Sequence, residues 1–251
     1  MIRLPTATPS YKQRLYAAYV SSGQANVRHV GSASAAQLFA PNKPYIVQTI
    51  RPLLPADKTA AILDLGCGNG CYLYFIKQGG YTNVMGLDTS AEQVAVAHRL
   101  GIHEVQQGDI HTYLTAYGEP TDVVLLMDVI EHLSRQETFD LLDRVYALLK
   151  PGGKLLLHVP NAEGLFGMRV RYGDLTHEQC FTPGSMRQLL STVGFQRFVC
   201  REDKPVVHGP LSLLRRIVWE VGTWPLRLLL LAETGAGGAI LSQNMLVVAT
   251  K

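Results

Sequence analysis

The sequence predicts an α/β protein with a Rossmann-like, doubly wound and mostly parallel sheet. From Ala60 onward, short apolar segments of strand length alternate with helix-length segments, the pattern of a chain that repeatedly crosses a parallel sheet. The first apolar segment runs into a glycine-rich turn at 63–70 (LDLGCGNG), and Asp88 ends the second. This combination is typical of a fold that binds a nucleotide-like cofactor at the carboxyl ends of its strands.

The individual elements follow from local patterns. The turn at 150–153 (KPGG) leads into a strand so apolar on both faces that helices should cover each side of the sheet. The expected strands are 60–65, 83–87, 103–106, 122–127, 154–159, 195–200 and 245–250, with helices at 70–78, 90–100, 134–149 and 182–193 between them.

The chain is expected to consist of a core and two appendages. Within the N-terminal part, residues 10–20 have the pattern of a short helix that could serve as a lid, and a second helical pattern ends at Pro55. The expected parts are 1–55 as N-terminal cap helices, 56–204 as the cofactor-binding core, 205–234 as an apolar helical insertion and 235–251 as the closing strand of the core.

Composition narrows the class of protein. With 47% hydrophobic and 17% charged residues, the 251-residue chain is expected to fold around a packed core. A net charge of +3 and the lack of a dense block of lysine and arginine argue against a nucleic-acid partner. The four cysteines include no CxxC pair, and the first residues contain no apolar run typical of a signal peptide. A cytoplasmic enzyme without a cysteine metal site is expected.

The glycine turn indicates a ligand. Gly66, Gly68 and Gly70 allow the backbone to turn sharply and to approach a ligand closely, and Asp88 is placed to accept both hydroxyls of a ribose. Capping of a helix near Ala91 is the alternative role for Asp88, but it leaves the glycines unexplained. A nucleotide-like cofactor is therefore expected at this turn.

Five motifs resemble, in order, those of class I S-adenosylmethionine-dependent methyltransferases: ILDLGCGNG, GLDTS, QQGDI, DVVLLMDVIEHL and LLKPGGKLLLHVPN. The resemblance covers residues 60–161 and implies a seven-stranded sheet with S-adenosylmethionine at the carboxyl ends of the strands. A cofactor without phosphate also explains why the turn contains no Lys or Arg, which disfavours a kinase. The implied cofactor-binding residues are Asp64 and Gly66 by the methionine part, Asp88 by the ribose, Asp109 and Ile110 by the adenine, with Gly68 and Asp128 beside them.

A second resemblance concerns the residues beyond the cofactor. In ubiquinone-biosynthesis O-methyltransferases and in enzymes that methylate small-RNA 3′ ends, an acidic-x-x-Glu-His motif similar to Asp128, Glu131 and His132 holds a magnesium-like ion. In the RNA enzymes a further histidine precedes an aromatic-Thr pair, as His177 precedes Phe181 here. The resemblance implies a magnesium or manganese site with four ligands, Asp128, Glu131, His132 and His177, although those families more often have Glu in place of Asp128.

The same residues are the candidates for catalysis. A divalent ion could bind and acidify an acceptor hydroxyl. Without a metal, His132 or His177 is the expected general base, since an imidazole titrates near neutral pH, and Glu131 stands beside them. The alternative is structural, because Glu131 and His132 stand where a helix should start and could bond to local backbone amides.

The expected acceptor rests on a further resemblance. The strings RLYAAYVSSGQ, VPNAEG and RYGDLTHEQCFTP are similar to those of methyltransferases encoded for bacterial surface glycans such as O-antigens, which methylate sugars. This implies a sugar hydroxyl of a surface polysaccharide or its precursor as acceptor, with Tyr16, Tyr19 and Tyr172 as candidate sugar contacts. A quinone or phenol O-methyltransferase and a noncatalytic cofactor-binding scaffold are the alternatives.

The insertion at 205–234 is more apolar than a connector needs to be. Its pattern predicts helices broken near Pro225, with Arg215, Arg216 and Arg227 on the polar side. The apolar stretches are too short to span a bilayer. We expect a helical hairpin that covers the sheet or forms a homodimer interface, and the alternative is a peripheral anchor on the inner face of the membrane.

Overall fold

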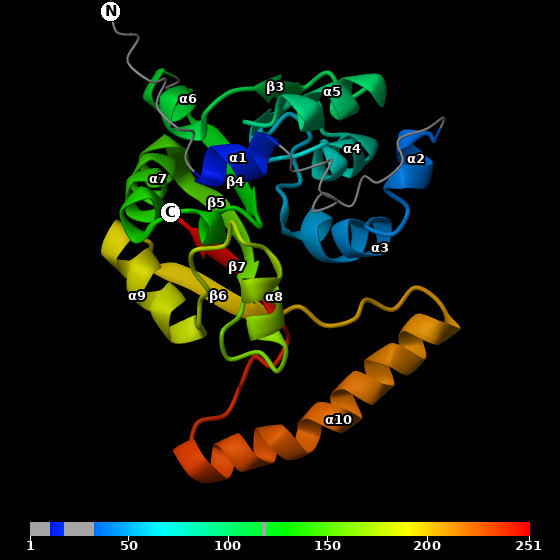
Figure 1. Ribbon diagram of the computed structural model, residues 1–251, viewed down its shortest axis with the longest axis vertical. Helices are drawn as coiled ribbons and strands as arrows, with labels where there is room; N and C mark the ends of the chain where they lie inside the picture. The colour runs from blue at the N-terminus through cyan, green and yellow to red at the C-terminus, as the bar shows by residue number, and fades with distance from the viewer. Residues whose placement is uncertain (1–10, 18–32, 117–118) are drawn as a thin grey trace, which may run out of the picture.

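The computed structural model describes residues 11–17, 33–116 and 119–251, arranged around one central sheet (Figure 1). The predictions for Tyr19 and for the side chain of Tyr16, and residues 18–20 of the helix expected at 10–20, lie outside the described residues. The sheet has seven strands in the order β3-β2-β1-β4-β5-β7-β6. The strands are β1 (Ile62–Leu65), β2 (Val84–Asp88), β3 (Val105–Gln107), β4 (Thr121–Met127), β5 (Leu149–Pro160), β6 (Arg197–Glu202) and β7 (Asn244–Thr250).

Strand direction and order place the site. Strands β1 to β5 pair in parallel, whereas β7 is antiparallel to both β5 and β6. From β1, the chain extends the sheet through β2 and β3 on one side and then through β4 and β5 on the other. The carboxyl ends of β1 and β4 therefore form the switch point at which doubly wound sheets bind ligands. The predicted α/β class with a seven-stranded, mostly parallel sheet is confirmed.

Helices pack on both faces of the sheet. Side chains alternate along β4, so Val124 and Leu126 belong to one hydrophobic cluster while Val123 and Leu125 belong to the other. The first cluster includes residues of α6 (Ile110–Ala116), α7 (Arg135–Leu148) and α9 (Pro183–Val193); the second includes residues of α2 (Ala35–Leu38), α4 (Cys71–Gln78) and α5 (Ala91–Arg99). The other described helical elements are α1 (Tyr11–Ala17), α3 (Lys43–Tyr45), η1 (Ile46–Ile50), η2 (Arg51–Leu53), η3 (Ile130–His132), α8 (Gly167–Gly173) and α10 (Pro210–Thr234).

The insertion forms one continuous helix, α10, so the expected break near Pro225 is wrong. Pro225 cannot donate a hydrogen bond to the carbonyl of Val221. Both residues are exposed, however, and a carbonyl on the solvent side of a helix can tilt outward toward water. The proline therefore removes one hydrogen bond without ending the helix.

The expected helical hairpin over the sheet is also wrong. α10 lies at one end of the molecule, apart from the strands (Figure 1). Its buried residues are Ser212 and Thr223, both polar. Among the residues that the structure describes, no helix combines the length and the apolarity needed to cross a bilayer.

Candidate active site

The glycine turn between β1 and α4 forms one wall of a cavity at the switch point. Gly66, Gly68 and Gly70 have φ values of 77°, 55° and 78°. Residues with a side chain rarely adopt this left-handed backbone conformation. A Cβ atom on Gly66 would lie 2.6 Å from Cγ2 of Val129, so a side chain there would collide with the segment after β4. The amide of Gly66 donates to the carbonyl of Leu87 (2.8 Å), which holds the turn against the end of β2.

Asp88 ends β2 with its carboxylate bonded to the glycine turn. Its Oδ2 accepts a hydrogen bond from the amide of Gly68 (2.7 Å), and its Oδ1 accepts one from the amide of Ser90 (2.8 Å). Ser90 caps α5, because its side chain accepts from the amide of Gln93 (3.3 Å). Helix capping therefore belongs to Ser90, and the contact of Asp88 with a ribose stays a prediction.

Asp64, on β1, lies two residues before Gly66 and is not among the residues that line the cavity. It is 1% exposed, and its Oδ2 has no hydrogen-bond partner within the described part of the chain. Burial, with a smaller effect from the charge of Asp88, raises the pKa of Asp64 to about 8. A buried carboxyl oxygen without a partner suits the ammonium group of a methionine moiety. The residues present therefore fit S-adenosylmethionine.

The cavity has a volume of about 400 Å³, which is within the range of about 300–1,000 Å³ for small-molecule sites. Asp109 lies at the edge of the cavity and directly precedes α6, whose first turn it caps, because Oδ1 of Asp109 accepts from the amide and the hydroxyl of Thr112 (both 2.8 Å). Lys12 and His132 line the same cavity, so the predicted cofactor and catalytic residues adjoin. Of the predicted cofactor residues, those that line it are Gly66, Gly68, Asp88, Asp109, Ile110 and Asp128.

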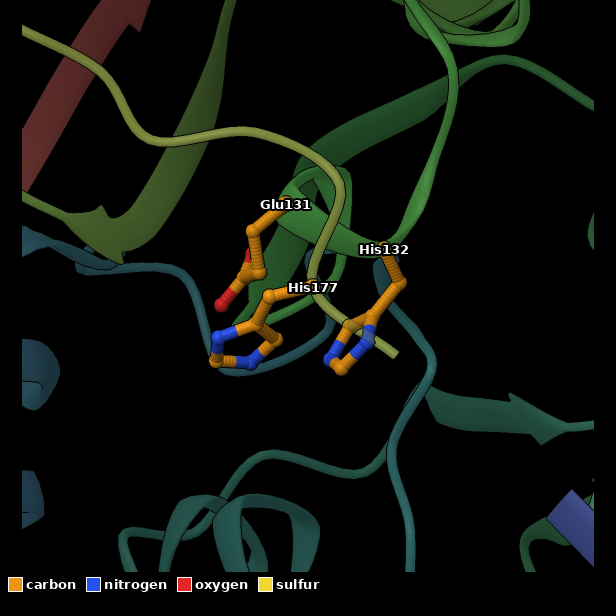
Figure 2. A group of neighbouring side chains, drawn as sticks. All are labelled: Glu131, His132 and His177. Atoms are coloured by element: carbon orange, nitrogen blue, oxygen red, sulfur yellow. The ribbon is translucent and has the colours of Figure 1, made fainter. Parts of the chain in front are cut away.

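Three of the four candidate metal ligands come together after β4. Glu131 and His132 lie on η3, His177 lies in the loop after α8, and their ligand atoms are within 4.8 Å of one another (Figure 2). The rings of His132 and His177 meet edge to face with centroids 4.6 Å apart. The backbone joins the two segments, because the amides of Glu178 and Gln179 both donate to the carbonyl of Glu131 (2.7 and 3.0 Å).

The hydrogen bonds of the two imidazoles fix their tautomers. Oγ1 of Thr176 donates to the carboxylate of Asp174 (2.6 Å), so it accepts from Nδ1 of His132 (2.8 Å). Nδ1 of His177 donates to the carbonyl of Val170 (3.0 Å). In the neutral form of each ring, Nε2 then carries the lone pair. Burial, with a smaller effect from His177, lowers the pKa of His132 to about 4, so this ring is neutral at physiological pH.

Glu131 supplies the third ligand atom of the cluster. It is 1% exposed, and its Oε2 has no hydrogen-bond partner among the described residues. Burial, and then the charge of Asp128, raises the pKa of Glu131 well above its ordinary value. Ser134 and Glu137 cap the start of α7, so Glu131 does not cap that helix, and its local backbone bond is to its own amide. A partnerless carboxyl oxygen beside two imidazoles fits a divalent ion.

Asp128 does not join this cluster, which corrects the expected four-ligand set. Asp128 has a φ of 58°, a left-handed conformation that aspartate tolerates better than most residues. Its Oδ1 bonds to Nδ1 of His158 on β5 (2.6 Å), and Nε2 of His158 bonds to Oδ2 of Asp203 (3.2 Å). Although burial lowers it, the charges and hydrogen bonds of the two carboxylates raise the pKa of His158 well above its ordinary value. His158 is thus an imidazolium that holds Asp128 away from the cluster.

Sequence reasoning missed His158 and Asp203. The signal was the isolated histidine in the apolar run LLLHVP at 155–160, because a buried imidazole requires polar partners. It also missed Lys12 of α1, whose Nζ donates to the carbonyl of His132 (2.9 Å) and pairs with Glu178 (2.6 Å). These contacts place α1 against the cluster, where a lid would lie.

The fold and the site define a class of protein. The strand order, the glycine turn after β1 and the acidic residue ending β2 are those of S-adenosylmethionine-dependent methyltransferases. The family model described as a methyltransferase domain matches residues 37–198. The chain belongs to this family, whose methyltransferases use S-adenosylmethionine as the methyl donor.

Known proteins are similar to this chain at modest identity. The ubiquinone biosynthesis O-methyltransferase of Chelativorans sp. (strain BNC1) is 27% identical over 169 residues, which cover 60% of this chain and 63% of that protein. The protein of the same name from Roseobacter denitrificans is 37% identical over 103 residues, which cover 38% of this chain and 39% of that protein. The match thus spans less than two thirds of either relative. The crystal structure of a SAM-dependent methyltransferase from Archaeoglobus fulgidus, 20% identical, has a TM-score of 0.64 and covers 93% of this chain and 99% of that one, which shows the shared fold.

Proposed function

We propose that this chain is an O-methyltransferase that places an acceptor hydroxyl at Glu131, His132 and His177. The observation that carries the proposal is the convergence of a buried carboxyl and two imidazoles beside the cavity of the glycine turn. S-adenosylmethionine supplies the methyl group. A hydroxyl is a weak nucleophile until its proton is removed, so transfer to oxygen needs a base or an ion at this place.

His132 is the group best placed to take that proton. Thr176 fixes its Nδ1, its Nε2 carries the lone pair, and the residue lines the cavity. His177 is oriented in the same way by the carbonyl of Val170. The hydroxyl proton passes to Nε2 of His132 while the acceptor oxygen is held in line with the methyl group.

The same cluster suits a divalent ion. Two imidazoles and one carboxylate favour manganese or zinc over magnesium, which prefers oxygen ligands. Glu131, His132 and His177 would hold the ion, and Asp128 would remain on His158. A bound ion supplies acidity, because a hydroxyl that it coordinates ionises at lower pH.

A phenolic hydroxyl of a small molecule is the acceptor that we infer. A phenol ionises at a pH of about 10, and a base as weak as His132 can deprotonate it more readily than a sugar alcohol. The relatives named above are ubiquinone biosynthesis O-methyltransferases, which agrees with this choice. The glycan acceptor expected from the sequence, and a role in polysaccharide biosynthesis, have no support in these comparisons.

An acceptor panel tests the proposal. The protein is incubated with methyl-labelled S-adenosylmethionine and with catechols, hydroxybenzoates, nucleotide sugars, an oligosaccharide and primary amines, and the products are identified by mass spectrometry. We expect label on a phenolic oxygen. Label on sugars alone would overturn the phenolic acceptor, and label on amines alone would overturn O-methylation. Binding of the cofactor without transfer to any acceptor would favour the noncatalytic scaffold.

A further inference from the structure

α10 turns its apolar side away from the protein. Ten of its large apolar side chains are 44–73% exposed, among them Leu214, Val218, Val221, Trp224 and Leu228. A helix on the surface of a globular protein ordinarily turns its apolar stripe toward the core. The orientation of α10 is the reverse, so this face requires an apolar partner outside the described chain.

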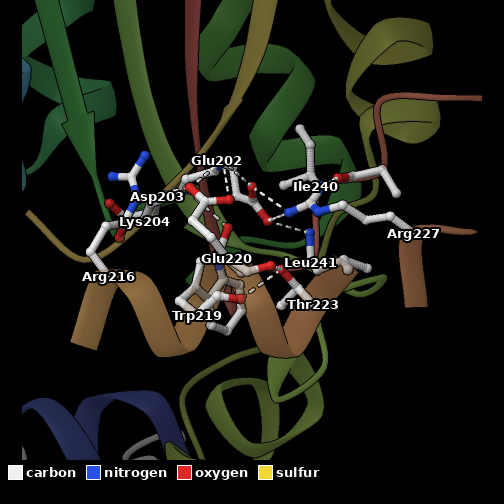
Figure 3. Close-up of polar contacts among 12 residues, drawn as sticks. Glu202, Asp203, Lys204, Arg216, Trp219, Glu220, Thr223, Arg227, Ile240 and Leu241 are labelled. Atoms are coloured by element: carbon white, nitrogen blue, oxygen red, sulfur yellow. Dashed lines mark hydrogen bonds and ion pairs between the residues drawn. The ribbon is translucent and has the colours of Figure 1, made fainter. Parts of the chain in front are cut away.

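Polar contacts on the opposite side hold α10 in this orientation (Figure 3). Nη2 of Arg227 bonds to both carboxylate oxygens of Glu202 (2.7 Å each) at the end of β6. Glu220 accepts from Arg216 (2.8 Å) and from Lys204 (3.0 Å). The Arg216–Glu220 bond lies within α10, whereas Arg227–Glu202 and Lys204–Glu220 link the helix to β6 and to the segment that follows it, so its outward face does not result from a loose connection.

The width of the apolar face distinguishes between occupants. At 100° per residue, the exposed apolar positions from Leu211 to Leu231 fill an arc of roughly 160° that contains no charged residue. Pairing with a second α10 would use a narrow seam of two positions in seven and would leave the flanks of this arc in water. A lipid surface would cover the whole arc along a helix of about 37 Å.

A second segment and two cations continue the surface. Leu165 and Phe166, which are 44% and 57% exposed, line a groove with Leu214 and Val218 of α10. Arg215 lines the same groove, and a further exposed arginine, Arg169, follows Phe166 on α8. Arginines at the border of an apolar face are suited to the phosphates of anionic lipids.

We propose that the outer face of α10, together with Leu165 and Phe166, docks on an anionic lipid bilayer with the helix axis parallel to the membrane plane. The apolar side chains enter the boundary between headgroups and acyl chains, and Arg215 remains at the phosphates. The inner face, with Glu202 and Glu220, stays on the protein. Docking of this kind does not depend on which acceptor the active site takes.

The two tryptophans of the chain give a matched test. Trp224 is 61% exposed on the outer face, whereas Trp219 is only partly exposed and lines the groove nearer the core. In the Trp219→Phe protein, vesicles of phosphatidylcholine and phosphatidylglycerol should shift Trp224 emission to shorter wavelength, and lipids brominated on the acyl chains should quench it. In the Trp224→Phe protein, Trp219 should respond much less. An unchanged Trp224 spectrum at saturating lipid would overturn the proposal.

Vesicle flotation separates lipid binding from self-association. We expect the wild-type protein to float with the mixed vesicles, and the Val221→Glu/Leu228→Glu protein to lose about 10-fold or more in lipid affinity. Val199→Glu, which puts the same charge on an exposed residue of β6, is the control and should float. Retained S-adenosylhomocysteine binding checks folding. A wild-type protein that does not float overturns the proposal, and if sedimentation then shows a dimer that the double variant dissociates, a second copy covers the face.

Discussion

Asp64 and Asp88 lie near the carboxyl ends of neighbouring strands, yet the hydrogen bonds that their carboxyl groups make are different. Asp88 accepts two backbone amides, whereas Oδ2 of Asp64 is buried without a partner in the described chain. A carboxylate bonded to the glycine turn is placed for hydroxyl groups, and a partnerless one is placed for a cation. The two residues would therefore recognise opposite ends of the methyl donor.

Replacing Asp88 tests the ribose contact. Asp88→Ala should weaken S-adenosylhomocysteine binding by about 10-fold or more, because two hydrogen bonds to a charged acceptor are lost. Thr182→Ala is the control: it removes the cap of α9, does not touch the cavity lining, and should cost about 1 kcal/mol of stability while leaving the affinity unchanged. Titration calorimetry measures the affinities, and thermal unfolding measures the stability. Equal affinity of Asp88→Ala and wild type would remove the assignment.

The pKa of Asp64 predicts how stability changes with pH. Because the folded-state pKa of about 8 is above the ordinary value of 3.8, the unfolded chain loses this proton first, and the folded state is penalised as pH rises from about 4 to about 8. Asp64→Asn removes the penalty. Its stability relative to wild type should increase by roughly 4 kcal/mol between about pH 5 and about pH 9 without cofactor. Urea unfolding at both pH values measures this, and a difference that does not change with pH would contradict it.

The sequence predicted single residues well where a motif fixes the backbone. The glycine turn and Asp88 needed only the spacing of glycines and one acid after apolar strands. Asp128 was placed wrongly because its partner, His158, is thirty residues away on β5 and the left-handed φ of Asp128 has no sequence signature. A contact between distant residues is set by packing, which a motif does not encode.

At the scale of elements, apolar runs located the strands and periodic segments located the longer helices. The seven-residue helices α6 and α8 were missed, because two turns give too few positions to show a 3.6-residue period. A break in α10 at Pro225 was predicted wrongly. The expectation that proline ends a helix applies best where the carbonyl four residues before it is buried, and here that carbonyl can reach water.

The strain that Pro225 imposes on α10 can be measured. Pro225→Ala restores an amide that can donate to the carbonyl of Val221, so we expect a gain in stability of about 1–3 kcal/mol without vesicles. Val218→Ala, at a similarly exposed position, should change stability by less than about 1 kcal/mol. Thermal unfolding followed by circular dichroism compares them. A loss of stability in Pro225→Ala would show that the proline is required for the helix.

At the scale of the whole molecule, the site exists only because the sheet brings separate segments together. η3 follows β4, His177 lies after β5 and α8, and α1 adds Lys12 from the N-terminal part of the chain, before the core. Backbone bonds from Glu178 and Gln179 to Glu131 fix the first two segments. The resemblance named the residues of the cluster, but the exclusion of Asp128 from it required the structure.

Metal removal tests the ion at this cluster. With chelator, kcat should fall by about 10-fold or more, and manganese or zinc should restore it in wild type but not in His177→Ala. S-adenosylhomocysteine affinity should be the same with and without chelator, because the cofactor residues are separate from the cluster. Full activity in chelator would exclude the ion and leave His132 as a base acting alone.

The most direct test of the active site is the turnover of His132→Ala with the phenolic acceptor identified by the panel, compared with its affinity for S-adenosylhomocysteine. We expect kcat to fall by about 100-fold or more, since the group that takes the hydroxyl proton is gone. The affinity should stay within about threefold of wild type, because the glycine turn, Asp64 and Asp88 are intact. A kcat within about threefold of wild type, with cofactor binding preserved, would contradict the assignment of the reaction to this cluster.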